Sequence, residues 1–213
     1  MNTLRTLLIG LVAAFVASPG LAEPGPAAVI EEVSTLMLEA INDRRDELEG
    51  DAQELQRIVD EILLPRFDLR YSGGLVMGKY WRKANDEQRD RFILALYHSL
   101  VRTYSSSLLD YKGDELDVLP VTDDLSEGKV VVETRVTLET GVITPVNYRM
   151  RRGKDGAWKA YDVIIEGISY VTNYRKQYSS EFRAKGIDAV IDELESKDTM
   201  EEATTASAEA PGD

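Results

Sequence analysis

The stretch VNYRMRRGKDGAWKAYDVII, residues 146–165, decides the fold class of this chain. In its first part, apolar residues such as Tyr148 and Met150 alternate with polar ones. A period of two is typical of a strand with one buried face. Residues 153–156 (GKDG) are typical of a tight turn, and a second strand is expected over residues 158–165. The stretch therefore predicts an antiparallel β-hairpin.

The same alternation precedes this hairpin. Val130, Val132 and Val136 are spaced two or four residues apart, and Gly141 is suited to the turn that follows. Residues 116–120 alternate in the same way with acidic residues. Three or four successive strands joined by short turns predict an antiparallel meander.

Helical periodicity flanks the strands on both sides. Before the strands we expect helices over residues 27–48 and 53–64, followed by a short segment over 67–77. A long helix is then expected to begin at a capping box formed by Asn85 and Gln88 and to end at Gly113. After the strands we expect one helix that begins at Ile168 and another over residues 187–194. The buried line of the first helix is expected to run through Ile41, Arg44 and Leu48. This order predicts an α+β fold, a curved antiparallel sheet of about four strands with helices on one face.

The two ends of the chain have compositions unlike the rest. Residues 1–22 are typical of a secretory signal: Arg5 precedes an apolar run over 7–16, and small residues stand before Glu23. An uncleaved anchor is the alternative, although the run is short for a membrane span. Residues 198–213 carry five acids and no base, which predicts a disordered acidic tail. Residues 23–197 are then expected to form a single domain.

Composition excludes several classes of protein. The chain has 25 basic and 38 acidic residues, a net charge of −13, which argues against nucleic-acid binding. It has no cysteine and a single histidine, His98, so disulfides, thiol catalysis and cysteine-based metal sites are excluded. A secreted chain without cysteine fits a bacterial periplasmic protein better than a disulfide-rich scaffold. We expect His98 to be a solvated or hydrogen-bonded helix residue with no catalytic or metal-binding role.

Two carboxylates are the candidates for catalysis. Asp162 and Glu166 share strand parity near the expected junction of strand and helix, where they could divide acid and base work. The alternative is structural: Asp162 bonds backbone or an arginine, and Glu166 caps the helix that begins near Ile168.

A basic cluster lies on the hairpin, made of Arg149, Arg151, Arg152 and Lys154. It can be a solvated face that protects a sheet edge from pairing. It can also meet an acidic partner or a lipid headgroup. Apolar residues are in excess on the expected sheet and helices, which fits either a filled core or an apolar pocket between them.

Several segments resemble the MlaC family of proteins. They are residues 75–82 (LVMGKYWR) followed by Gln88, Arg89 and Phe92; residues 104–111; residues 158–169 (WKAYDVIIEGIS), continuing through Asn173, Tyr174, Arg175 and Gln177; and residues 185–188 (KGID). The resemblance covers about residues 28–195. It departs from the family at Met77, where leucine is usual, and in the tail after residue 197.

The resemblance implies a periplasmic phospholipid carrier and no enzymatic activity. It implies a nuclear-transport-factor-two-like sheet with added helices that holds the acyl tails of a phospholipid, without a cofactor or metal. It also implies an inner-membrane ABC transporter with a ring-forming substrate-binding subunit, and an outer-membrane lipoprotein–porin complex, as partners in maintaining outer-membrane lipid asymmetry.

We predict a lipid pocket between one sheet face and the helices. The sheet wall is expected to be Val132, Val136, Tyr148, Met150, Val163 and Ile165; the helix wall is expected to be Leu75, Leu96, Leu100, Tyr104, Ile168 and Val171. Glycines 73, 74 and 78 would let the mouth flex. The parity of Val163 and Ile165 is open, because a slip of one residue reverses it. Two rival functions are an enzyme acting through Asp162 and Glu166, and a plain interaction module with a filled core.

Overall fold

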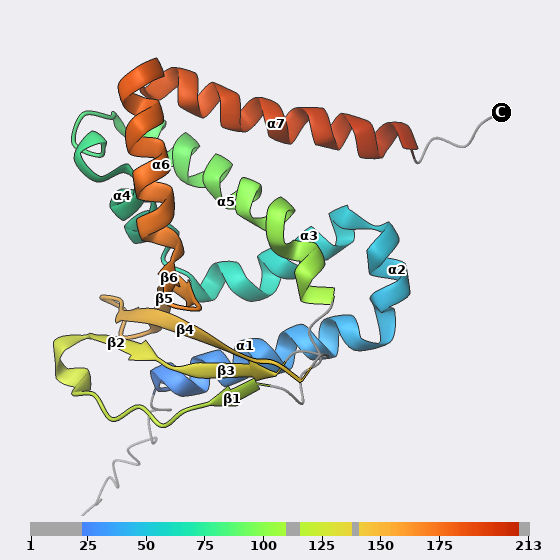
Figure 1. Ribbon diagram of the computed structural model, residues 1–213, viewed down its shortest axis with the longest axis vertical. Coiled ribbons are helices and arrows are strands. Elements are labelled where there is room, and N and C mark those ends of the chain that lie inside the picture. Colours follow the sequence, from blue (N-terminus) through green and yellow to red (C-terminus); the bar gives the residue numbers. More distant parts are fainter. Residues whose placement is uncertain (1–22, 110–115, 138–140, 209–213) are drawn as a thin grey trace, which may run out of the picture.

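The computed structural model describes residues 23–109, 116–137 and 141–208 (Figure 1). The helices are α1 (Pro26–Ile41), α2 (Arg45–Gly50), α3 (Ala52–Leu63), α4 (Leu69–Met77), α5 (Asp86–Leu109), α6 (Tyr170–Lys185) and α7 (Ile187–Ala208). Short 3-10 turns are η1 (Asn42–Arg44), η2 (Leu64–Arg66), η3 (Gly78–Tyr80) and η5 (Leu125–Glu127). The strands are β1 (Leu116–Val118), β2 (Lys129–Val132), β3 (Thr134–Thr137), β4 (Ile143–Arg152), β5 (Trp158–Ile165) and β6 (Ile168–Ser169).

The strands form one six-stranded antiparallel sheet in the order β1-β3-β4-β5-β6, with β2 also paired to β4. Strands β2 and β3 continue one register against β4, because Val132 lies opposite Tyr148 and Arg135 lies opposite Pro145. The backbone N–H of Thr134, just after the break at Glu133, donates to the side chain of Asn147. The α+β fold class and the antiparallel sheet predicted from the sequence are confirmed, with more strands than expected.

A β-bulge lies in the middle of β5. Arg149 is paired with Asp162 and the next residue, Met150, is paired with Ala160, so Tyr161 is the extra residue. A bulge shifts the alternation of side chains by one position. Ala160 on one side of the bulge and Val163 on the other therefore point to the same face of the sheet.

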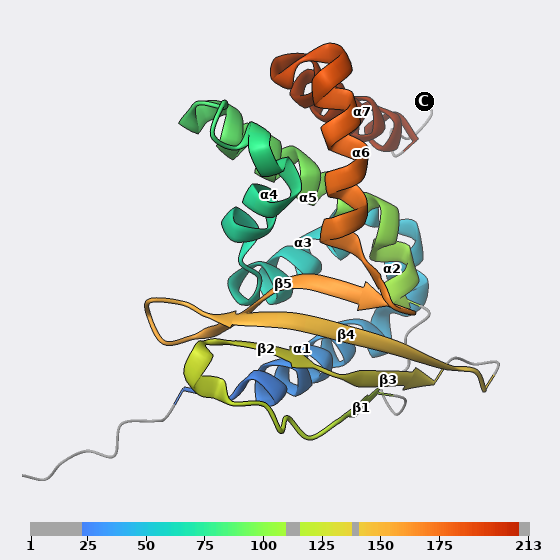
Figure 2. The same cartoon turned by 60° about the vertical axis from the view of Figure 1, so that its left-hand side comes forward.

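Helices contact both faces of the sheet, whereas the sequence predicted one covered face. Helix α1 packs on the face that carries Val130 and Val132, which we name the α1-side face. Helices α4 and α6 meet the opposite face near β5, which we name the α4-side face: Tyr71 contacts the ring of Tyr161 there. In Figure 2 α1 lies behind the sheet, and α4 and α6 rise above β5.

Buried side chains of the described residues gather in three clusters. The sheet core joins the first turns of α1 to the α1-side face, through Val29, Ile30, Val132 and Met150 among others. The α3 core joins the end of α1 to α2, α3 and α5. The α6 core joins α4, α5, α6 and α7 around Phe92. Helix α5 contributes to two of these clusters, so it connects the two helical parts of the molecule.

The prediction of one continuous helix over residues 27–48 is wrong. Helix α1 ends at Ile41, and η1 separates it from α2. Arg44, which the periodicity put on the buried line, bonds to Glu47 and Glu54 instead. A guanidinium is costly to bury without paired carboxylates, so the chain turns where the apolar line would be interrupted by a charge.

The C-terminal end of the described chain differs from the prediction. Helix α7 continues to Ala208, so residues 198–208, expected to be disordered, are helical in the structure. Alanine and glutamate, which are good helix formers, make up five of these eleven residues. The expected signal over residues 1–22 and the last residues of the tail lie outside the described residues. No helix in the described ranges is both long and apolar enough to cross a membrane.

Candidate functional site: the α1-side face of the sheet

Strand pairing places a set of apolar side chains on the α1-side face, together with Thr134 and Thr144. Cross-strand partners in a sheet share a face, and the register brings together Val130, Val132, Val136, Val146, Tyr148, Met150, Ala160, Val163 and Ile165. The predicted sheet wall therefore lies on one face, as expected. The bulge explains the open question of parity, because it puts Ala160 on the same face as Val163 and Ile165.

This face has two unlike halves. The half near α1 belongs to the sheet core, and Val132 and Met150 are fully buried there. In the other half, Val136, Val163 and Ile165 are only partly buried, as is Val146, which the prediction did not include. These four side chains belong to none of the three clusters formed by the described residues. Apolar side chains grouped on one face and left outside the packed cores are what a binding surface for an apolar ligand requires.

The predicted helix wall does not lie opposite this face. Leu96 is buried in the α6 core, and Leu100 and Val171 pack against it. Leu75 is half-buried on α4, which meets the α4-side face. The prediction of one pocket with these residues as its second wall is therefore wrong in its geometry: periodicity shows that a helix has an apolar side, and does not show which neighbour covers it.

Two residues of the predicted helix wall lie at the edge of the face. Ile168 is 61% exposed and is paired with Ile165 across the turn between β5 and β6. Tyr104, near the end of α5, is also exposed, and its ring lies 5.3 Å from that of Tyr170 in an edge-to-face arrangement. Burial, with a hydrogen bond to Tyr104, raises the pKa of the Tyr170 phenol to about 12. Ile168 and Tyr104 thus contribute apolar and aromatic surface at the end of the sheet where β5 meets β6.

Two of the three glycines, Gly73 and Gly78, have a packing role. A Cβ added at Gly73 would lie 2.5 Å from Cγ1 of Ile93, so Gly73 lets α4 approach α5 closely. Gly78 has a φ of +55° and ends α4, with the guanidinium of Arg175 directly against it. The expectation that these glycines form a flexible mouth does not fit their place between α4, α5 and α6.

Asp162 has the structural role named above as its alternative. It is 1% exposed and accepts three hydrogen bonds: from Arg149 Nη1 (3.0 Å), from the hydroxyl of Ser169 (2.6 Å) and from the N–H of Val171 (3.0 Å). Its carboxylate thereby ties β4 and β5 to the start of α6.

Glu166 lies outside any shared site with Asp162. It is exposed, with a φ of +50°, and forms the turn between β5 and β6 together with Gly167 at +80°. Two positive φ values are typical of a type I′ hairpin turn. Glu166 does not cap α6, because Ser169 is the capping residue and accepts from Thr172. The carboxylate of Glu166 therefore does not join that of Asp162 in one site.

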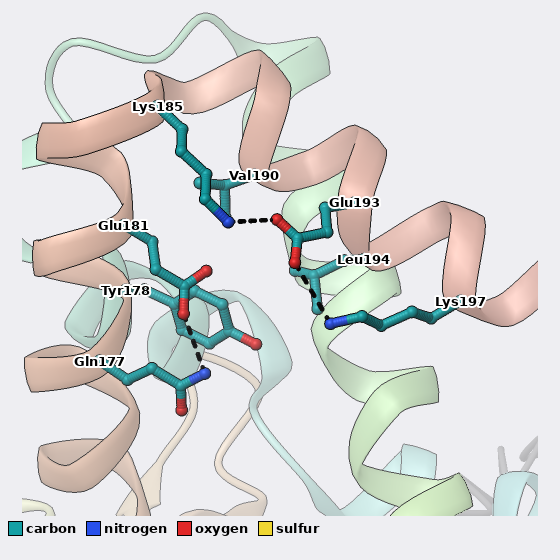
Figure 3. A pocket seen from close by; sticks show the side chains of 8 residues that line it. All are labelled: Gln177, Tyr178, Glu181, Lys185, Val190, Glu193, Leu194 and Lys197. Carbon is teal, nitrogen blue, oxygen red and sulfur yellow. Dashed lines mark hydrogen bonds and ion pairs between the residues drawn. The ribbon is translucent and has the colours of Figure 1, made fainter.

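A small polar pocket lies between α6 and α7 (Figure 3). Its volume is about 190 Å³, and charged side chains line it, with Lys185 and Lys197 both bonded to Glu193. Tyr178 closes its floor, and burial raises the pKa of this phenol to about 12. Pockets for drug-sized ligands are about 300–1,000 Å³, so this polar pocket does not suit a lipid. Among the residues that the structure describes, no three His, Cys, Asp or Glu side chains are grouped to hold a metal ion.

The protein thus belongs to the α+β class, and part of the apolar α1-side face of its antiparallel sheet lies outside the three packed clusters of the described residues. The chain belongs to the MlaC family, because the family model described as "MlaC protein" matches residues 31–196. The resemblance found in the sequence motifs is thereby confirmed.

Two curated relatives and one solved structure are similar over most of the chain. The intermembrane phospholipid transport system binding protein MlaC of Haemophilus influenzae is 24% identical, over 89% of this chain and 90% of its own length. Toluene tolerance protein ttg2D of Pseudomonas putida is 29% identical, over 90% and 89%. The structure of a phospholipid-binding protein from Ralstonia solanacearum, in complex with a phospholipid, is 23% identical, with a TM-score of 0.75 over 83% of this chain and 98% of that chain.

Proposed function

We propose that this protein binds a phospholipid and transports it, with the acyl chains held against the half-buried part of the α1-side face. The observation that carries the proposal is the group Val136, Val146, Val163 and Ile165, four apolar side chains on one face that no core cluster of the described residues absorbs. Support comes from the relatives: one is named a phospholipid transport binding protein, and the solved structure of similar fold contains a phospholipid.

A carrier of this kind is required on energetic grounds. Each buried methylene is worth about 0.8 kcal/mol, so two acyl chains with roughly 30 methylenes carry on the order of 24 kcal/mol of transfer free energy. A phospholipid therefore does not cross an aqueous space unassisted. Exchange between a bilayer and an apolar protein face is close to balanced, because both environments are apolar. Binding without chemistry is then sufficient, and the direction of transport is set by an energy source outside this chain.

We place this activity in the periplasm, between the outer and inner membranes, where it would maintain outer-membrane lipid asymmetry. The signal-like residues 1–22 and the absence of cysteine from the sequence support this location. The partners we propose are an inner-membrane ABC transporter, through its ring-forming substrate-binding subunit, and an outer-membrane lipoprotein–porin complex. The name of the Haemophilus relative, a binding protein of an intermembrane transport system, supports such an assembly.

The arrangement of Asp162 supports a carrier over an enzyme on the same scaffold. All three of its hydrogen bonds hold backbone or side chains of β4, β6 and α6 in place. Glu166 is in a solvated turn, so the pair does not present an acid and a base to one substrate.

Extraction of the purified protein with organic solvent tests the proposal. We expect near-stoichiometric phospholipid, detected by mass spectrometry, and we expect Val163→Asp to lose it because a carboxylate would stand among the acyl chains. The matched control is Val131→Asp, a half-buried valine on the α4-side face, which should keep the lipid. Circular dichroism would show that both variants are folded. A lipid-free wild type would favour the plain interaction module, and equal lipid in both variants would place the lipid elsewhere.

A further inference from the structure

Positive charge is concentrated in two short segments of this acidic chain. Residues 66–83 and 149–159 contain ten of the 25 bases and only two of the 38 acids, Asp68 and Asp155. The bases are Arg66, Arg70, Lys79, Arg82, Lys83, Arg149, Arg151, Arg152, Lys154 and Lys159. The remainder of the chain is therefore even more acidic than the net charge of −13 suggests.

The fold joins these two segments along the β5 edge of the sheet. Phe67 forms a parallel bridge with Ala160, and the N–H of Asp68 donates to the carbonyl of Ala160 at 2.7 Å. Arg151 reaches from β4 to the carboxylate of Asp68 at 2.6 Å. In Figure 2 the segment that contains α4 rises directly above the hairpin of β4 and β5. Arg152 is paired with Trp158 of the sheet core and therefore points to the α1-side face. We name the surface formed by the other bases of residues 66–83 and 149–159 the basic face.

Carboxylates neutralise only part of the basic face. Lys129, Arg151 and Lys159 lie side by side across β2, β4 and β5, and like charges directly opposite one another destabilise a sheet. Asp68 pairs with Arg151, whereas Lys129 donates to the phenol of Tyr71 (2.9 Å). Lys159 has no ion pair with a carboxylate of the described residues.

The part of the basic face that follows α4 also has more bases than carboxylates. Lys79 and Lys83 both lie over the ring of Tyr80, at 5.2 and 5.4 Å from its centroid. In the described ranges neither lysine, nor Arg82, has a carboxylate within ion-pair distance. Four arginines of the basic face are ion-paired: Arg66 to Glu32, Arg70 to Asp86 and Asp90, Arg149 to Asp162, and Arg151 to Asp68. The other bases of this face, Lys79, Arg82, Lys83, Lys154 and Lys159, have no ion pair with a carboxylate of the described residues and are available to an external anion.

The face lacks the apolar side chains that strengthen binding at a bilayer interface. The exposed large apolar side chains of the described residues are Leu94, Tyr104, Val142, Ile143 and Ile168, and none belongs to the two segments. Its aromatic rings lie beneath the cations: Arg151 lies 4.3 Å from the centroid of Tyr71, and Lys79 lies 5.2 Å from that of Tyr80. Binding at a bilayer interface combines basic residues with apolar side chains that insert. Cations without such side chains favour a protein surface.

We propose that the basic face docks an acidic surface of a protein partner. Complementary charge accelerates encounter and fixes orientation. The strongly acidic remainder of the chain would repel the same partner elsewhere, so docking in one orientation follows. This inference does not depend on the proposed lipid binding, because the basic face uses neither the four half-buried residues of the α1-side face nor the end of the sheet.

Binding of labelled poly-L-glutamate, followed by fluorescence anisotropy at low and high salt, tests the proposal. We expect the wild type to bind at low salt. The variant Lys79→Gln/Arg82→Gln/Lys83→Gln/Lys154→Gln removes four exposed bases of the basic face and should bind at least about ten-fold more weakly. The matched control, Arg135→Gln/Lys176→Gln/Arg183→Gln/Lys197→Gln, removes four exposed bases elsewhere and should bind within about two-fold of the wild type.

Three results would overturn the proposal: no binding of poly-L-glutamate by the wild type, equal weakening in both variants, or capture by phosphatidylglycerol vesicles in place of poly-L-glutamate. The last result would assign the face to a membrane. The Val163→Asp variant should bind poly-L-glutamate like the wild type, so failure of the lipid proposal and failure of this one are distinguishable.

Discussion

The two faces of the sheet are held to their helices by different means. On the α1-side face, Val132 and Met150 are fully buried in the apolar sheet core, which includes the first turns of α1. On the α4-side face, hydrogen bonds and ion pairs dominate, including those of Asp162 and the pair of Arg151 with Asp68. The hydroxyl of Ser72 on α4 also donates to the carbonyl of Tyr161 at 2.7 Å.

This difference separates two tasks. Apolar packing is non-directional and can adapt to a ligand of variable shape, which suits the face that we propose for acyl chains. Hydrogen bonds are directional, and they set how α4 and α6 are positioned relative to the strands. The three predictions that follow probe this contrast, from the largest expected effect to the smallest.

Met150→Ala tests the packed face. Its side chain is fully buried in the sheet core, and we expect a loss of about 3 kcal/mol in the free energy of unfolding from lost burial and the cavity left behind. Urea denaturation measures this. Lys159→Ala, on the α4-side face, should cost less than about 0.5 kcal/mol. A smaller loss for Met150→Ala than for Lys159→Ala would contradict the contrast between the faces.

Asp162→Ala tests the hydrogen bonds on the α4-side face. Three donors would lose their acceptor, and we expect about 2 kcal/mol of destabilisation, tempered because Arg149 is 41% exposed and can turn to water. Urea denaturation again gives the value. Asp162→Asn keeps one acceptor oxygen and should lose less. If both substitutions left stability unchanged, the carboxylate would not hold α6 to the sheet.

Glu166→Asn tests the turn between the strands and α6. Asparagine adopts positive φ more readily than glutamate, so we expect a gain of about 0.5 kcal/mol in the free energy of unfolding. Glu166→Val is the opposite case, because a branched side chain is strained at positive φ, and it should lower the midpoint of thermal unfolding. A gain for valine would mean that the turn has another conformation.

The strands and most helices were predictable from the sequence because periodicity reports local geometry. Tyr148 and Met150 were placed on one face correctly, since each strand alternates regularly within itself. The bulge at Tyr161 was not predictable: a single extra residue leaves no mark in the pattern of apolar residues, although it decides the face of everything after it. The parity of Val163 was therefore an open question until the register was known.

The candidate site was only partly predictable, because the neighbour of an apolar surface depends on tertiary packing. The sequence predicts Leu96 and Leu100 in the helix wall of the pocket, whereas in the structure Leu96 lies in the α6 core and Leu100 packs against it. Val146, which shares the half-buried part of the α1-side face, was recognised as part of a strand but was not assigned to the site. Its alternation with polar neighbours was the signal that could have placed it there.

The longest motif of the family resemblance has a structural explanation in this chain. Within residues 158–169, Asp162 bonds to the start of α6, Gly167 supplies a positive φ, and Ser169 caps α6. The motif therefore corresponds to the residues that connect the sheet to α6.

Helix α5 has a consequence for how the molecule comes apart. Its consecutive residues Leu96 and Tyr97 point into different clusters, Leu96 into the α6 core and Tyr97 into the α3 core, where its phenol bonds to Asp60. Neither helical cluster can lose its order while α5 stays fully packed on both sides. The helices on either side of α5 therefore belong to one cooperative unit, whose backbone amides would open to hydrogen exchange together.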